Sequence, residues 1–130
     1  MLYPLMNYHF SDRLDLVKLQ EFYDGDPRIA VGVFEAFVQE TVTALPQLDQ
    51  LFQENNVVEF RRLVHKIKPG FLYVGLTSLY GMLSELEQSC DKSADTLNVA
   101  GLFSEVDAKL KSEIPWVEEE LDRMRVLEAM

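Results

Sequence analysis

The chain of 130 residues is long enough for one compact domain with a core, and at 48% hydrophobic residues it is too apolar for a disordered tail. Its net charge of −10 disfavours nucleic acid and anionic membranes as partners, and no apolar run approaches the roughly 20 residues of a membrane helix. A single cysteine, Cys90, excludes an internal disulfide and suits a cytoplasmic protein, as does the lack of signal-peptide features after Met1.

The apolar residues recur with a helical period throughout, and no stretch alternates as a strand does. A short first helix is predicted from about Asp12 to Tyr23. Ser11 or Asp12 can cap its start, and Asp24-Gly25 ends it.

A long second helix is predicted to open at Asp26-Pro27. Aspartate is a preferred N-cap, and proline at the first helical position loses no hydrogen bond. Pro46 lies inside the pattern, so we expect a kink there. One apolar stripe follows the helical spacing: Ile29, Val33, Phe37, Thr41, Leu45, Leu48 and Phe52.

Asn55-Asn56 breaks the chain before a third helix. Asn56 followed by Glu59 resembles a capping box, so the helix is predicted over 57–73 with Gly75 as the turn after it. A fourth helix is predicted from Thr77 or Ser78 to near Cys90, followed by a polar loop over 91–98.

A fifth helix is predicted to be kinked or interrupted at Pro115. Its apolar positions are Leu102, Val106, Leu110, Val117, Leu121 and Met124. Four long amphipathic helices with short connections predict an all-α fold: an up-down-up-down four-helix bundle with a short additional N-terminal helix. We expect residues 1–130 to form this single domain.

The third helix carries the main functional candidate, His65. At about 100° per residue its apolar positions cluster on one line, and His65 lies roughly 140° away from it, facing solvent. Arg61 and Lys68 lie between His65 and that line, one turn either side. Leu72 lies farther along the same face, and Arg62 and Pro69 flank the other side.

An exposed imidazole between two cations suits phosphoryl transfer. An imidazole nitrogen is a competent nucleophile near neutral pH, and Lys68 and Arg61 can offset the charge of a phosphoryl group. The simpler interpretation is an ordinary solvated histidine on a basic patch. That patch contains Arg61, Arg62, Lys66 and Lys68, a third of the 12 basic residues.

Residues 65–75, which read His-Lys-Ile-Lys-Pro-Gly-Phe-Leu-Tyr-Val-Gly, resemble the motif of the histidine-phosphotransfer (HPt) domain family. His65 matches the phosphorylated histidine, Ile67 the aliphatic position, Lys68 the lysine and Gly75 the distant glycine. Gly25-Asp26 and Leu86-Glu87 resemble pairs elsewhere in the family. The resemblance covers a motif-bearing core of about residues 14–90.

The resemblance implies a phosphorelay intermediate that is neither kinase nor phosphatase. His65 would carry the phosphoryl group, with Lys68 stabilising it and Arg61 as a further helper. Arg62, Pro69, Gly70 and Leu72 would form the docking surface. Tyr80, Gly81 and Ser84 could border that surface.

The partners implied are response-regulator receiver domains and a hybrid histidine kinase. The receiver would supply Mg²⁺, so no cofactor is expected on this chain. We expect a monomer, and the start at Met1 together with the complete bundle favours a free-standing protein.

Pro69 departs from the family pattern, which usually has glycine there. The proline ring adds bulk near His65 and removes the N–H that would bond the His65 carbonyl, so docking geometry and partner choice come into question. A bundle that binds a signalling partner without phosphorylation is therefore the alternative, and a structural dimer is a third interpretation.

Other candidates are weaker. His9, His65 and Cys90 lack metal-ligand spacing, so no metal site is expected. Glu118-Glu119-Glu120 is predicted to be solvated helix surface. For the residue that bonds the second ring nitrogen of His65, the sequence suggests only a polar residue of the second helix, such as Gln39.

Overall fold

A computed structural model describes residues 8–24, 26–93 and 95–129. Within these ranges the chain is helical and contains no strand. The elements are α1 (Leu16–Tyr23), α2 (Arg28–Gln53), α3 (Val57–Tyr73), α4 (Thr77–Asp91), the 3-10 helix η2 (Thr96–Val99) and α5 (Ala100–Glu128). Gly25, predicted to end the first helix, lies outside the described residues.

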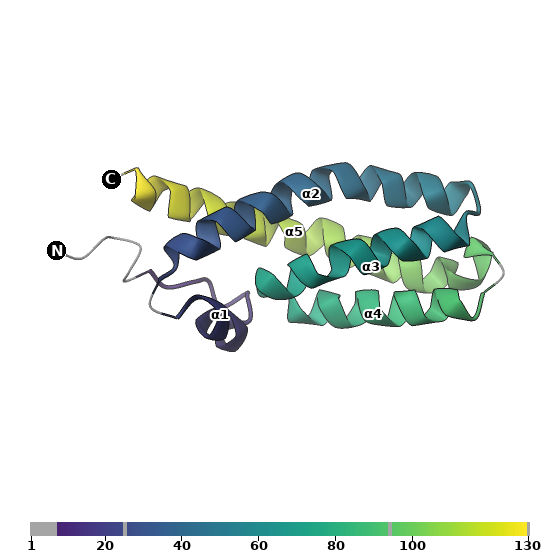
Figure 1. The fold of residues 1–130 in the computed structure, drawn as a ribbon, viewed down its shortest axis with the longest axis horizontal. Helices are drawn as coiled ribbons and strands as arrows, with labels where there is room; N and C mark the ends of the chain where they lie inside the picture. The colour runs from purple at the N-terminus through teal and green to yellow at the C-terminus, as the bar shows by residue number, and fades with distance from the viewer. Residues whose placement is uncertain (1–7, 25, 94, 130) are drawn as a thin grey trace.

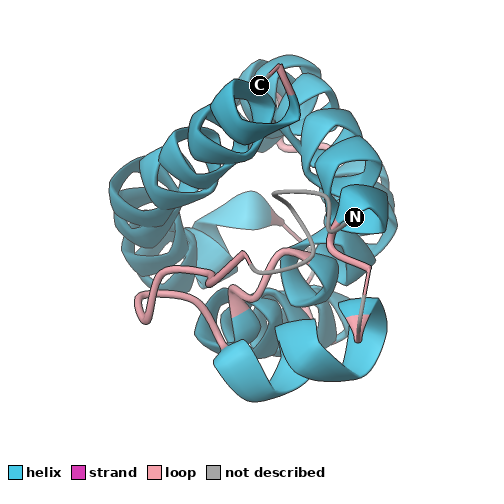
Figure 2. Ribbon diagram, turned by 90° about the vertical axis from the view of Figure 1, so that its left-hand side faces the viewer, coloured by secondary structure: helices cyan, strands magenta, loops and turns pink. Residues whose placement is uncertain are grey.

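The four long helices form a bundle in which each packs against two others (Figure 1). α2 lies against α3 and α5, and α4 lies against the same two helices. Viewed from the end at which α5 finishes, the helices enclose the core, and α1 lies at that end (Figure 2). The predicted four-helix bundle with a short N-terminal helix is confirmed.

Two helix starts differ from the predictions. α1 begins at Leu16 rather than near Asp12, because Asp15 is the residue whose side chain accepts the N–H of Lys18, at 3.2 Å. α2 begins at Arg28, one residue later than predicted, although the Asp26 carboxylate does accept the N–H of Arg28.

Pro46 and Pro115, the two prolines at which kinks were predicted, lie within uninterrupted helices. α2 continues through Pro46, and α5 runs from Ala100 to Glu128 through Pro115, so the predicted interruption of the fifth helix is absent. Each proline is exposed on its helix. There water can satisfy the carbonyl that loses its amide partner, which limits the cost of the missing hydrogen bond.

The core is built from aromatic and aliphatic side chains of all five α-helices. The predicted stripe of α2 is wrong at its start, since Ile29 is 58% exposed. Ala30, Phe34, Phe37 and Thr41 are also spaced by threes and fours, and all four are buried. The other buried residues of α2 are Val31, Ala44 and Leu48. Ile29 lies about 100° from Ala30 around the helix and so falls outside the core.

Gly75 forms the turn between α3 and α4, as predicted. Its φ of +81° favours glycine, and a Cβ there would lie 3.0 Å from the Asp15 nitrogen and from Leu14 Cβ. The amides of Gly75 and Leu76 bond the carbonyls of Leu72 and Phe71, which is a Schellman motif. The turn is held from outside as well, because the Asp15 amide donates to the Gly75 carbonyl at 2.8 Å.

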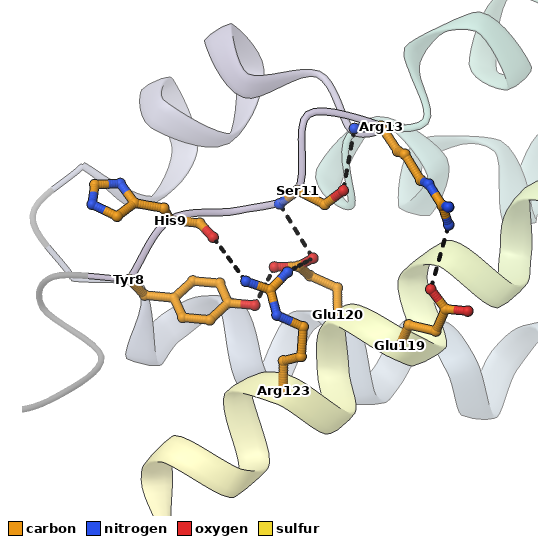
Figure 3. A network of polar contacts seen from close by, with 7 residues as sticks. All are labelled: Tyr8, His9, Ser11, Arg13, Glu119, Glu120 and Arg123. Carbon is orange, nitrogen blue, oxygen red and sulfur yellow. Dashed lines mark hydrogen bonds and ion pairs between the residues drawn. The ribbon is translucent and has the colours of Figure 1, made fainter.

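The segment before α1 lies along α5 and is fixed by polar contacts (Figure 3). Glu120, only 1% exposed, accepts hydrogen bonds from the Tyr8 hydroxyl, the Ser11 amide and Arg123. The prediction that Glu118-Glu119-Glu120 is solvated surface is therefore wrong for Glu120, although Glu118 and Glu119 are exposed.

Among the described residues, α2 alone passes a test of length and composition for a membrane-crossing helix. The core helix of a soluble protein passes the same test, and α2 contributes Phe34, Phe37 and Leu48 to the core of this bundle.

Candidate functional site: the exposed histidine of α3

His65 lies in the middle of α3 with 66% of its side chain exposed. On the same helix Phe60, Val64, Ile67 and Phe71 are buried, so the core fixes the rotation of α3 and turns His65 outward. The helical spacing predicts this orientation, and the structure has it.

One ring nitrogen of His65 contacts the neighbouring helix. Nδ1 lies 2.9 Å from Oε2 of Glu87, whose side chain is 11% exposed on α4. The suggestion that Gln39 fills this role is wrong, because Gln39 is an exposed residue of α2 and Glu87 occupies the position beside Nδ1. Sequence reasoning noted Leu86-Glu87 as a family-like pair without giving Glu87 a role.

Two cations share the same glutamate. Lys68 Nζ lies 3.0 Å from Glu87 Oε1, and an Arg61 nitrogen lies 3.5 Å from Oε2. Arg61 also pairs with Asp91, one turn farther along α4. No described donor makes a well-aligned hydrogen bond to Oε1, so Lys68 acts on that oxygen as a counter-charge.

Lys68 is the better enclosed of the two cations. Its side chain is 17% exposed against 39% for Arg61, and its ammonium lies 5.6 Å from the centre of the Tyr80 ring. Packing of α3 against α4 thus holds Lys68 beside His65, while Arg61 lies closer to solvent.

The charge of Glu87 determines which His65 nitrogen carries the proton. Burial raises the pKa of Glu87, but the contacts with Lys68 and His65 outweigh it and hold that pKa below the ordinary glutamate range. Glu87 is therefore a carboxylate at neutral pH and can only accept hydrogen bonds. Nδ1 must then carry the proton, which leaves the lone pair of the neutral ring on Nε2.

The opposite flank of His65, toward α2, has a different character. Pro69 is exposed one turn after His65, and Arg62 pairs with Glu59 on its own helix. The half-buried Leu72 lies instead on the Lys68 side of His65. Lys66 is exposed and makes no ion pair with any described residue. Basic and apolar surface thus meet on this side of the imidazole.

Gly70 has a packing role in the structure. A Cβ on Gly70 would lie 3.2 Å from Cδ1 of Phe37, so the absence of a side chain lets α3 approach the buried Phe37 of α2. Of the residues expected to border the site, Tyr80 and Ser84 are half-buried and Gly81 is exposed on α4.

The described residues hold no group of three or more His, Cys, Asp or Glu side chains placed to bind a metal ion. His9 lies in the segment before α1, whereas Cys90 is buried in α4 one turn after Glu87.

Comparison with known proteins matches residues 32–126 to the family model described as Hpt domain. The match runs from α2 to near the end of α5 and so contains His65, Lys68 and Glu87. Searches of curated proteins and of solved structures gave no significant match. Because the family model covers most of the chain, this protein belongs to the Hpt domain family, whose members carry phosphoryl groups in two-component signalling.

Proposed function

We propose that His65 accepts a phosphoryl group from the aspartyl phosphate of one receiver domain and passes it to another. The observation that carries this proposal is the pairing of Nδ1 with Glu87 on an otherwise exposed ring. That pairing orients the imidazole and leaves Nε2 as its nucleophilic atom.

The transfer step balances without any catalytic base on this chain. The Nε2 lone pair attacks phosphorus, the N–P bond forms, and the P–O bond to the receiver aspartate breaks to release a carboxylate. Nδ1 keeps its proton, so the phosphorylated ring is an imidazolium that faces the Glu87 carboxylate, whose Oε2 lies 2.9 Å from Nδ1 in the resting protein. The same contact stabilises the positive ring that forms during attack.

Lys68 is the residue best placed to stabilise the transferring group. It lies one turn from His65 on the side of α4, and its resting partner is Oε1 of Glu87, an oxygen that accepts no well-aligned hydrogen bond from any described residue. A dianionic phosphoryl group on Nε2 would compete with Glu87 for the Lys68 ammonium. Arg61, bound to both Glu87 and Asp91, is the less available cation.

The partners of this reaction are receiver domains, fed by a hybrid histidine kinase, and the receiver supplies Mg²⁺ and the acidic pocket. This chain acts as a carrier and contributes the nucleophile and its charged surroundings. The complex must be transient for the carrier to leave one receiver and meet the next, which favours a monomer with a small interface.

The test is phosphotransfer in vitro. The protein is mixed with a phosphorylated receiver domain and Mg²⁺, and label stable to alkali but lost in acid is measured on the wild type and on His65→Gln. We expect label on the wild type and none on the variant. A folded protein that takes no label from a panel of receivers, yet still binds one of them, would instead support the non-phosphorylated adaptor.

A further inference from the structure

A groove of about 400 Å³ opens between α2 and α3 beside His65. Its walls are mainly small or apolar and come from both helices: Gly32, Val33 and Ala36 of α2, and Pro69, Gly70 and Tyr73 of α3. Phe37 lies at its base, while Glu40 and Lys66 add charged groups to its lining.

The groove exists because α2 has two small residues, Gly32 and Ala36, in its wall. Gly32 and Ala36 are one helical turn apart and both exposed. A Cβ built on Gly32 would meet nothing within 4 Å, so the space beside it is open. The space beside Gly70 is different, because the Phe37 ring already fills it. A Cβ on Gly70 would lie 3.2 Å from Cδ1 of Phe37.

The position of the groove ties it to the proposed transfer reaction. Lys66 follows His65 directly and Pro69 lies one turn away, about 5–6 Å along the helix. A partner interface of ordinary size covers roughly 800 Å² on each protein. A receiver that brings an aspartyl phosphate to Nε2 of His65 therefore has to cover the groove.

We propose that the groove receives one large apolar side chain of the receiver domain that exchanges phosphate with His65, and that Gly32 determines which receivers fit. This inference rests on the proposed function and adds a selecting residue to it. An apolar anchor in a pocket at the centre of an interface is a typical source of affinity, and the exposed Lys66 complements an acidic receiver at the rim.

Substitutions that fill the groove test the proposal. Gly32→Leu and Ala36→Leu each place a side chain in it from successive turns of α2. The matched control is Gly101→Leu on α5, which also replaces an exposed helical glycine whose Cβ would meet nothing within 4 Å. Leucine favours the helix over glycine, so none of the glycine variants loses helix stability from the change itself.

Two phosphoryl donors separate docking from chemistry. The first is the receiver domain that labels the wild type fastest among a panel phosphorylated with acetyl phosphate. The second is phosphoramidate, which transfers its phosphoryl group to the imidazole, releases ammonia and needs no docking surface. We expect Gly32→Leu and Ala36→Leu to raise the half-saturating receiver concentration at least about tenfold, with phosphoramidate labelling unchanged.

Each alternative result has a defined meaning. If either filled variant behaves as Gly101→Leu does toward the receiver, the groove is not the docking pocket and the inference is wrong. If phosphoramidate labelling is lost as well, the effect lies at His65 and the inference is equally wrong. If no receiver and no phosphoramidate labels the wild type, the proposed function itself fails.

Discussion

Glu120 and Glu87 are two of the three glutamates buried among the described residues, and they differ in how exposed their partners are. Glu120 of α5 binds Tyr8, the Ser11 amide and Arg123, and this cluster fixes the segment before α1. Glu87 of α4 pairs with Arg61, Lys68 and one nitrogen of His65.

The difference lies in the chemistry of the partners. The Tyr8 and Ser11 contacts of Glu120 join the segment before α1 to α5, and the tyrosine hydroxyl is turned toward the carboxylate (Figure 3). The imidazole that Glu87 binds has a second nitrogen and a side chain that is 66% exposed. The two clusters thus differ in that Glu87 has a partner whose ring is mostly exposed, which is why the proposed chemistry is placed there.

The largest effect expected from this comparison is at Lys68. Lys68→Ala should slow phosphotransfer about 100-fold, because it removes a charge placed for the transferring phosphoryl group. The matched control is Lys109→Ala, since Lys109 pairs with the buried Glu113 at 2.9 Å on α5 and should leave the transfer rate unchanged. Equal phosphotransfer rates for Lys68→Ala and Lys109→Ala would contradict the proposed role of Lys68.

Glu120→Ala should affect stability and leave transfer intact. The substitution deprives Tyr8, the Ser11 amide and Arg123 of their shared acceptor, so we expect the free energy of unfolding to fall by about 2 kcal/mol. Urea denaturation measures this loss. Phosphotransfer is then measured under conditions in which the variant is folded. A lower transfer rate than that of the wild type would contradict the conclusion that the Glu120 cluster has no part in transfer.

Substitutions at Glu87 should act mainly on rate. Glu87→Ala removes the acceptor for Nδ1 and should slow transfer roughly tenfold, because the ring loses its fixed orientation and tautomer. Glu87→Gln keeps a carbonyl acceptor and should recover part of that loss. Single-turnover transfer from one receiver gives both rates, and a glutamine variant slower than the alanine variant would contradict the positioning role.

The smallest expected effect is on acid stability. The pKa of Glu87 is lower in the folded protein than in the unfolded chain, so its stabilising contribution is present at neutral pH and lost as pH falls through the folded pKa. When the free energy of unfolding is measured from neutral to acidic pH, it should thus fall less for Glu87→Gln than for the wild type. Identical pH dependence in the two proteins would count against a charged Glu87.

The sequence predicts the His65 face well because the information lies on one helix. The spacing of Phe60, Val64 and Ile67 sets the rotation of α3 and so turns His65 outward, with Lys68 beside it. The turn at Gly75 is equally local, since its positive φ requires a residue without a side chain.

Glu87 could not be assigned in the same way. Its contact with His65 depends on how α3 and α4 are aligned along the bundle, which no single-helix pattern contains. Glu120 was misread for a related reason, because only the path of the segment before α1 buries it. Helical periodicity therefore does not predict contacts between elements that are distant in the sequence.

The most direct test of the account is nitrogen NMR of the His65 ring before and after phosphorylation. In the free protein labelled with ¹⁵N-histidine, we expect the neutral His65 ring to carry its proton on Nδ1. After transfer from a receiver, it predicts the phosphoryl group on Nε2, with Nδ1 still facing Glu87. A phosphoryl group on Nδ1, or on any residue other than His65, would contradict it.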